Sequence, residues 1–276
     1  MRFWPGRRDI YNLRGRFPPP AEAFAGDYGE RHASFVCEVL DSPSLLACFD
    51  GRGRLPSGYG IGLDERVVEF PWAFRRLAPG ARVLDAGSTL NHPHILDRLL
   101  PRFRELTIVT LAPEPMSYPE RGISYVYADL RDLPFRDSRF DVIVSISTLE
   151  HVGMDNSGYG GPSVRAHDPD AELERAVGEL RRVIVPGGTL LITVPVGRAE
   201  DHGWFRQFDR RGVERLVSAL RPSRASTCFY LYSKDGWRQR SGKRVDDASY
   251  HEVLVDGPAS DHAAAARAVA CIEAVV

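Results

Sequence analysis

From Ala81 onward, short apolar segments alternate with amphipathic ones, and this alternation constrains the fold more than any other feature. Seven segments have the length and apolar content of strands, namely 81–87, 106–111, 123–130, 140–147, 189–196, 226–232 and 269–275. Helical spacing is found in 93–100, in 168–184 and after Asp209. Strands that alternate with helices predict right-handed crossover connections and a layered arrangement of sheet and helices. We therefore expect an α/β fold with a doubly wound, mostly parallel seven-stranded sheet and helices on both faces.

The helix expected over 168–184 has the clearest boundaries. Asp168 is a suitable N-cap, and Pro169 suits the first helical position. The run Pro186-Gly187-Gly188 is predicted to stop this helix before the fifth strand. No long helical segment precedes the final strand, which favours an antiparallel insertion there.

Residues 1–80 differ in composition from the rest. They include three consecutive prolines at 18–20 and five glycines between positions 51 and 62, which favour loops and short helices. A helix is predicted over 63–77, with Pro71 as a kink. We expect an irregular N-terminal cap or lid over 1–80 and a layered domain over 81–276.

The charge balance and the cysteines bear on partners and location. The chain has 36 Lys+Arg against 37 Asp+Glu, whereas nucleic-acid binders usually carry a basic surplus, so no nucleic-acid partner is expected. No apolar run approaches the roughly 18 residues of a membrane span. Cys37, Cys48, Cys228 and Cys271 lack metal-ligand spacing, which favours free thiols in the cytoplasm and no metal.

Polar residues follow successive predicted strands, where the carboxyl ends of parallel strands form ligand sites. Gly87 would let the backbone approach a ligand, and Asp85 beside it suits a cationic amino group. Asp129 is placed to accept a hydrogen bond from an adenine amino group, with Leu130 flanking the ring. Each residue alone also fits an ordinary turn. No GxGxxG motif is present, which disfavours a dinucleotide.

Four groups of residues carry a resemblance to a known family. They are Val83–Gly87; Ala128–Leu130 with Leu133–Phe135; Phe140–Ser145 running into Leu149–Val152; and Leu180–Val183 leading to Pro186–Leu190. In this order they resemble class I S-adenosylmethionine-dependent methyltransferases. The resemblance implies a Rossmann-like domain over 81–276 and S-adenosylmethionine as cofactor. It further implies a set of cofactor-binding residues: Asp85, Gly87, Ser88, Thr110, Leu111, Asp129, Leu130 and Ser147.

The sequence departs from the family pattern at two places. Ser88, Thr89 and Asn91 occupy the turn that is usually rich in glycine. Thr110 stands where an acidic residue usually binds the ribose hydroxyls, and Glu114 is a candidate substitute.

His151 is the candidate general base, because the pKa of histidine suits proton transfer near neutral pH. His167 and the pair Asp201-His202 are alternatives. Asp155 together with that pair has no ligand-like spacing, so metal is not expected. The loop 153–167 is glycine-rich and polar, as in a closing lid.

The segment 150–170 is similar to bacterial methyltransferases of glycan and small-molecule pathways. This similarity implies O-methylation of a sugar, a glycan precursor or another small molecule. Two alternatives stay open: a non-catalytic methyltransferase-like partner subunit, and a nicotinamide-dependent sugar-modifying enzyme. A homo-oligomer is compatible with the sequence.

Overall fold

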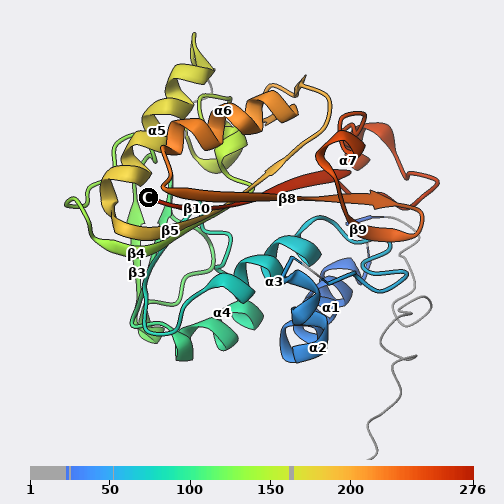
Figure 1. Ribbon diagram of the computed structural model, residues 1–276, viewed down its shortest axis with the longest axis horizontal. Helices are drawn as coiled ribbons and strands as arrows, with labels where there is room; N and C mark the ends of the chain where they lie inside the picture. The colour runs from blue at the N-terminus through green and yellow to red at the C-terminus, as the bar shows by residue number, and fades with distance from the viewer. Residues whose placement is uncertain (1–22, 25, 52, 162–164) are drawn as a thin grey trace, which may run out of the picture.

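The computed structural model describes residues 23–24, 26–51, 53–161 and 165–276. Its centre is an eight-stranded sheet in the order β3-β2-β1-β4-β5-β10-β8-β9 (Figure 1). The first five strands are parallel: β1 (Arg82–Ala86), β2 (Glu105–Thr110), β3 (Ile123–Tyr127), β4 (Phe140–Ile146) and β5 (Ile184–Pro195). The last three are antiparallel: β8 (Arg224–Ser233), β9 (Gly236–Arg240) and β10 (Ala268–Val275). The expected doubly wound α/β fold is confirmed.

The predicted count of seven strands was wrong, because β9 is an eighth. Only Trp237 is an apolar residue of this strand, and two of its five residues are arginines. As an edge strand it pairs with β8 alone, so it lacks the apolar run by which buried strands are recognised. A separate two-stranded ladder joins β6 (Glu200–Asp201) to β7 (Arg206–Gln207).

The antiparallel insertion is confirmed. β10 lies between β5 and β8, with Ile272 opposite Ile192 on one side and Thr227 on the other. All side chains from Ala268 to Ile272 are buried, as expected of a central strand.

The fifth strand begins earlier than the sequence indicates. Helix α5 (Pro169–Val183) passes directly into β5 at Ile184, and Pro186–Gly188 lies inside the strand. The pairing register with β4 shifts between Phe140 and Val142, where the extra residues form a bulge. The proline and glycines therefore mark a bulge and not the end of the helix.

Helices cover both faces of the sheet (Figure 1). On one face lie α1 (Tyr28–Asp41), α2 (Pro43–Leu46), α3 (Arg66–Arg76) and α4 (Pro93–Leu99), with their apolar side chains in one buried cluster. On the other face α5 and α6 (Arg210–Leu220) pack in a second cluster. The Asp168 side chain accepts hydrogen bonds from the backbone N–H groups of Asp170 and Ala171, which confirms the predicted N-cap.

The region before β1 contains more regular structure than expected. α1 has 14 residues and buries Phe35, Val36 and Val39 against the rest of the fold. α3 starts at Arg66 and continues through Pro71. The remaining short elements are α7 (Val253–Asp256) and single 3₁₀ turns, two of which, η5 (Leu149–His151) and η6 (Ser157–Tyr159), lie beside the site described below.

Within the described ranges, no helix combines the length and the apolar character that crossing a membrane requires.

Candidate cofactor pocket and active site

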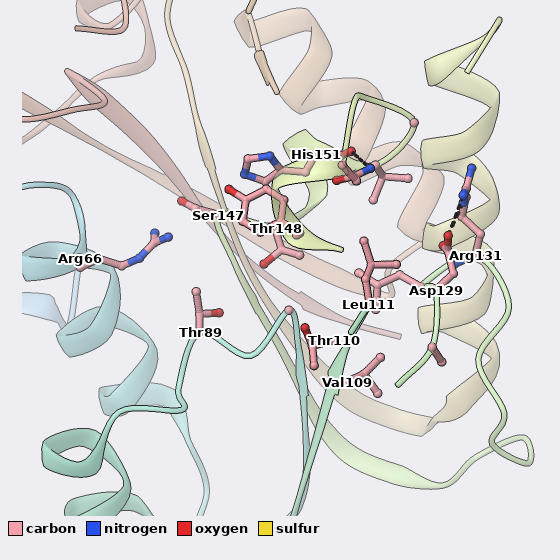
Figure 2. Close-up of a pocket in the computed structure, with 17 residues that line it drawn as sticks. Arg66, Thr89, Val109, Thr110, Leu111, Asp129, Arg131, Ser147, Thr148 and His151 are labelled. Atoms are coloured by element: carbon pink, nitrogen blue, oxygen red, sulfur yellow. Dashed lines mark hydrogen bonds and ion pairs between the residues drawn. The ribbon is translucent and has the colours of Figure 1, made fainter. Parts of the chain in front are cut away.

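A pocket opens at the carboxyl ends of β1, β2, β3 and β4 (Figure 2). The chain proceeds from β1 outward to β3 and then returns to β4 on the other side of β1, so this is the switch point of the sheet. The lining residues are Arg66, Gly87, Thr89, Val109, Thr110, Leu111, Ala128, Asp129, Leu130, Arg131, Ser147, Thr148, His151, Val152, Gly153, Asn156 and Tyr159. The fold thus brings together Gly87, Thr110, Leu111, Asp129, Leu130, Ser147 and His151 from the predicted set.

Gly87, in the turn after β1, lies close to Thr148 in the segment that follows β4. Its φ is 126°, a value that L side chains rarely adopt. A Cβ atom built at this position would lie 2.1 Å from Oγ1 of Thr148. Only glycine leaves this part of the pocket open.

Asp85 is not among the lining residues of the pocket. Its side chain is fully buried and accepts hydrogen bonds from the backbone N–H of Leu90, at 2.8 Å, and from Oγ1 of Thr89, at 3.5 Å. Burial raises the pKa of Asp85 to about 7. The carboxyl group therefore holds the turn that carries Gly87.

Ser88 also lies outside the pocket lining. Its hydroxyl donates a hydrogen bond of 2.8 Å to Oε2 of Glu114, and the Asn91 amide donates one of 3.0 Å to the same oxygen. Glu114, the candidate substitute for the ribose-binding acid, is thus occupied in tying two loops together. Thr110 does line the pocket.

Asp129 is bound on both carboxylate oxygens by Arg131. The Arg131 backbone N–H and Nε donate to Oδ1 at 2.9 Å, and a terminal nitrogen donates to Oδ2 at 2.6 Å. Burial opposes ionisation of Asp129, but the hydrogen bonds from Arg131 outweigh it and lower the pKa. Arg131 also pairs with Glu172 of α5 at 2.6 Å, which fixes the loop after β3 to the helical layer.

The sequence did not reveal a polar network that links α3 to the pocket. The fully buried Glu69 carboxylate accepts hydrogen bonds from Oγ of Ser147, at 2.7 Å, from Oγ1 of Thr193, at 2.6 Å, and from Arg66. Ser147 has a φ of 39°, a strained conformation for a non-glycine residue. The only signal in the sequence is one carboxylate amid the apolar residues of 67–70.

Through this network Arg66 enters the pocket from α3, opposite Asp129 and Arg131 (Figure 2). Burial disfavours its charge, but the nearby carboxylates, Glu69 first, raise the pKa of Arg66 overall. Arg66 is the second functional candidate that the sequence did not indicate.

His151 lies in η5 at the edge of the pocket. Its Nδ1 is 3.0 Å from the carbonyl oxygen of Trp204, so Nδ1 carries the proton and Nε2 keeps a free lone pair. Nε2 lies 4.0 Å from Oε1 of Glu150, whose other oxygen is buried without a hydrogen-bond partner among the described residues. Burial lowers the pKa of His151 to about 4 and raises that of Glu150 well above its usual range.

We predict that His151 stays neutral throughout the physiological pH range, because burial disfavours the imidazolium. Its NMR titration midpoint is expected at about 4 instead of 6.5, with His151→Gln identifying the resonance. The folded state then binds this proton less well than the unfolded state, so its contribution destabilises the fold as pH falls from 6.5 towards 4. A midpoint near 6.5 would contradict the buried environment.

The alternative bases and the considered metal ligands do not line this pocket. Asp201 pairs with Arg165 at 2.5 Å, and the Asp155 side chain accepts a hydrogen bond from the Ser157 backbone. His202 stacks on Phe205. In the described part of the chain, no group of three or more metal-ligating side chains is present.

Comparison with known proteins identifies the family to which part of this chain belongs. The family model of the methyltransferase domain matches residues 84–192, from β1 through β5. These residues form a methyltransferase domain. The finding confirms the resemblance to class I S-adenosylmethionine-dependent methyltransferases, and S-adenosylmethionine is the cofactor of that family.

The individual relatives of this chain are distant in sequence. The probable tRNA methyltransferase 9B of Homo sapiens is 29% identical over 134 residues, 48% of this chain and 24% of the relative. Nodulation protein S of Rhizobium tropici is 26% identical over 148 residues, 51% of this chain and 53% of the relative. The chain thus spans about half or less of the length of these relatives. The structure of the 1,6-didemethyltoxoflavin-N1-methyltransferase of Burkholderia thailandensis has a TM-score of 0.48, with 16% identity and 93% of each chain covered.

Proposed function

We propose that this protein transfers the methyl group of S-adenosylmethionine to a hydroxyl group of a small molecule, such as a sugar or glycan precursor. The observation that carries the proposal is the opening at Gly87, where any side chain would collide with Thr148. It lies at the switch point of a matched methyltransferase domain, so the residues present fit this cofactor.

The pocket residues suit the parts of the cofactor. Val109, Leu111, Ala128 and Leu130 offer apolar surface to the adenine ring, beside Asp129 as a hydrogen-bond acceptor. Thr110 offers a hydroxyl to the ribose. At the opposite side, Arg66 is suited to a carboxylate such as that of the methionine moiety.

In the proposed reaction, S-adenosylmethionine supplies an electrophilic methyl group. The pocket would orient the acceptor oxygen in line with this methyl group, so that a new C–O bond could form as the C–S bond breaks and S-adenosylhomocysteine leaves. The free Nε2 lone pair of His151 then accepts the hydroxyl proton. Because His151 is a weak base, we expect it to accept the proton late in the reaction. By then the acceptor oxygen is bonded to the methyl carbon and its proton is acidic.

We propose that residues 1–80 act as a cap, since α3 supplies Arg66 to the pocket, and that the loop 153–167 acts as a lid. A cytoplasmic location is also proposed, because all four cysteines are free thiols, as is usual in a reducing compartment.

Cofactor binding is tested by calorimetric titration with S-adenosylmethionine and S-adenosylhomocysteine. We expect micromolar binding to the wild type and about tenfold weaker binding to Asp129→Asn. The substitution replaces the carboxylate with an amide and so removes the charge-assisted hydrogen bonds that residue 129 can accept. Asp132→Asn is the matched control, since this exposed residue lies three positions away and outside the pocket lining. Failure of the folded wild type to bind either compound would refute the proposal.

The acceptor class is tested separately with labelled cofactor. Methyl transfer to a panel of sugars and nucleotide sugars supports the proposal. Transfer to bulk tRNA alone would replace it with an RNA acceptor, in keeping with the name of the human relative. Cofactor binding without transfer to any acceptor would favour the partner-subunit alternative.

A further inference from the structure

A second concavity lies at the far edge of the sheet, on β9. It is lined by Gly51, Gly53, Arg54, Leu55, Ser57, Arg238, Gln239, Arg240, Ser241 and Arg244. Four of these side chains are arginines, and no carboxylate is among the described lining residues. In a protein with a formal net charge of −1, this is a strong local excess of positive charge.

Three separate segments bring the arginines together. Arg54 comes from the loop before α3, Arg238 and Arg240 from β9, and Arg244 from the turn that follows. The loop is fixed to β9 by backbone hydrogen bonds from Gly58 to Asp235 and from Trp237 to Tyr59. The fold therefore holds these charges at one place, even though Arg54 lies far in sequence from the other three arginines.

The arginines are largely free of counter-charges. Arg238 pairs with Asp235 at 3.6 Å, whereas Arg54, Arg240 and Arg244 form no ion pair within the described ranges. The two arginines among the lining residues of the cofactor pocket, Arg66 and Arg131, are both ion-paired. Gathering unpaired like charges costs free energy, which a bound anion would offset.

Protection of an exposed sheet edge is the simpler explanation for charged residues on β9. It accounts for Arg238 and Arg240. It does not account for Arg54 and Arg244, which lie outside the strand and line the same concavity. Hydroxyl groups of Ser57 and Ser241 and the amide of Gln239 add neutral hydrogen-bond donors.

We propose that this concavity, lined by Arg54, Arg238, Arg240 and Arg244, is a binding site for a phosphoryl group. Guanidinium groups present paired N–H donors that match phosphate oxygens, and several of them together suit a doubly charged group. The site lies four strand positions from β4, or about 19 Å at the usual ~4.8 Å between strands. It is distinct from the cofactor pocket and does not rest on the proposed function.

Calorimetric titration of the full chain at low salt tests the site, with inorganic pyrophosphate in one arm and a single-stranded RNA oligonucleotide in the other. The double variant Arg240→Gln/Arg244→Gln is expected to bind at least about tenfold more weakly, since two charge-assisted contacts are lost. The matched control Arg136→Gln/Arg224→Gln removes the same charge from exposed positions away from this concavity and is expected to bind as the wild type does.

The two arms distinguish the source of the phosphoryl group. Pyrophosphate binding that the β9 variant loses supports a small phosphorylated ligand, and RNA binding lost in the same way supports a phosphodiester backbone. No binding of either probe to the wild type would overturn the proposal. Equal weakening in both double variants would also overturn it, because the effect would then come from net charge. Far-UV circular dichroism and thermal unfolding unchanged from the wild type verify that the variants are folded.

Discussion

Gly87→Ala protein is expected to bind S-adenosylhomocysteine at least about 100-fold more weakly than the wild type, and to be less stable by about 3 kcal/mol. Two effects act together. The φ of 126° is unfavourable for alanine, and the new methyl group would overlap Thr148 at Oγ1, Cγ2 and Cβ, at 2.1, 2.5 and 2.8 Å. Relief of the overlap requires either the first turn or Thr148 to move, and both line the pocket.

Gly80→Ala separates these two effects. Gly80 also has a positive φ, 76°, but its added Cβ would meet no atom within 4 Å. We expect a stability loss of about 1 kcal/mol from backbone strain and wild-type cofactor affinity. Calorimetry and thermal unfolding of both variants provide the measurement. Wild-type affinity in Gly87→Ala would show that the cofactor does not approach this turn.

Glu69→Ala is expected to lower the free energy of unfolding by about 3–5 kcal/mol, the usual cost of removing one partner from a buried ion pair. The substitution leaves the Arg66 guanidinium and the hydroxyls of Ser147 and Thr193 without their common acceptor. Glu69→Gln retains one carbonyl acceptor and is expected to cost less, about 1–3 kcal/mol.

Urea unfolding measures these differences, and Glu174→Ala on the exposed face of α5 is the control, with an expected change within about 0.5 kcal/mol. Because Arg66 and Ser147 both line the pocket, weaker cofactor binding is expected in Glu69→Gln even where the protein is fully folded. A cost below about 1 kcal/mol for Glu69→Ala would mean that water or neighbouring groups replace the carboxylate.

The sequence predicts the sheet well where a strand is buried on both faces. β1, β4 and β10 are apolar along most of their length, so their positions and the doubly wound order follow from apolar runs and the helices between them. β9 cannot be predicted in this way, because an edge strand is held by one neighbouring strand and one buried side chain, Trp237, and needs no apolar run. The start of β5 cannot be predicted in this way either, because a bulge that contains a proline and two glycines has the same sequence signal as the end of a helix.

Some residues of the candidate site could be predicted from the sequence, and others could not. Residues at or just after the carboxyl end of a parallel strand, such as Gly87, Thr110 and Asp129, can be assigned to the site by their place in the chain, since the fold brings these ends together. Arg66 and Glu69 belong to the helix predicted over 63–77, but no motif in the sequence relates this helix to the pocket, and only tertiary packing brings the two residues there. The orientation of Asp85 towards its own turn likewise depends on hydrogen bonds that spacing does not reveal.

The central position of β10 also affects the order in which the protein can fold during synthesis. β1 to β5 can pair with one another as soon as residue 195 is available, whereas β8 and β9 reach the sheet only through β10. Until residues 268–275 have left the ribosome, β5 has an open edge, and the β8–β9 hairpin has no other strand with which to pair. An exposed edge of this kind invites pairing with another chain. The nascent protein is therefore prone to aggregate from completion of β5 until arrival of β10, and the β8–β9 hairpin adds a second open edge late in this interval.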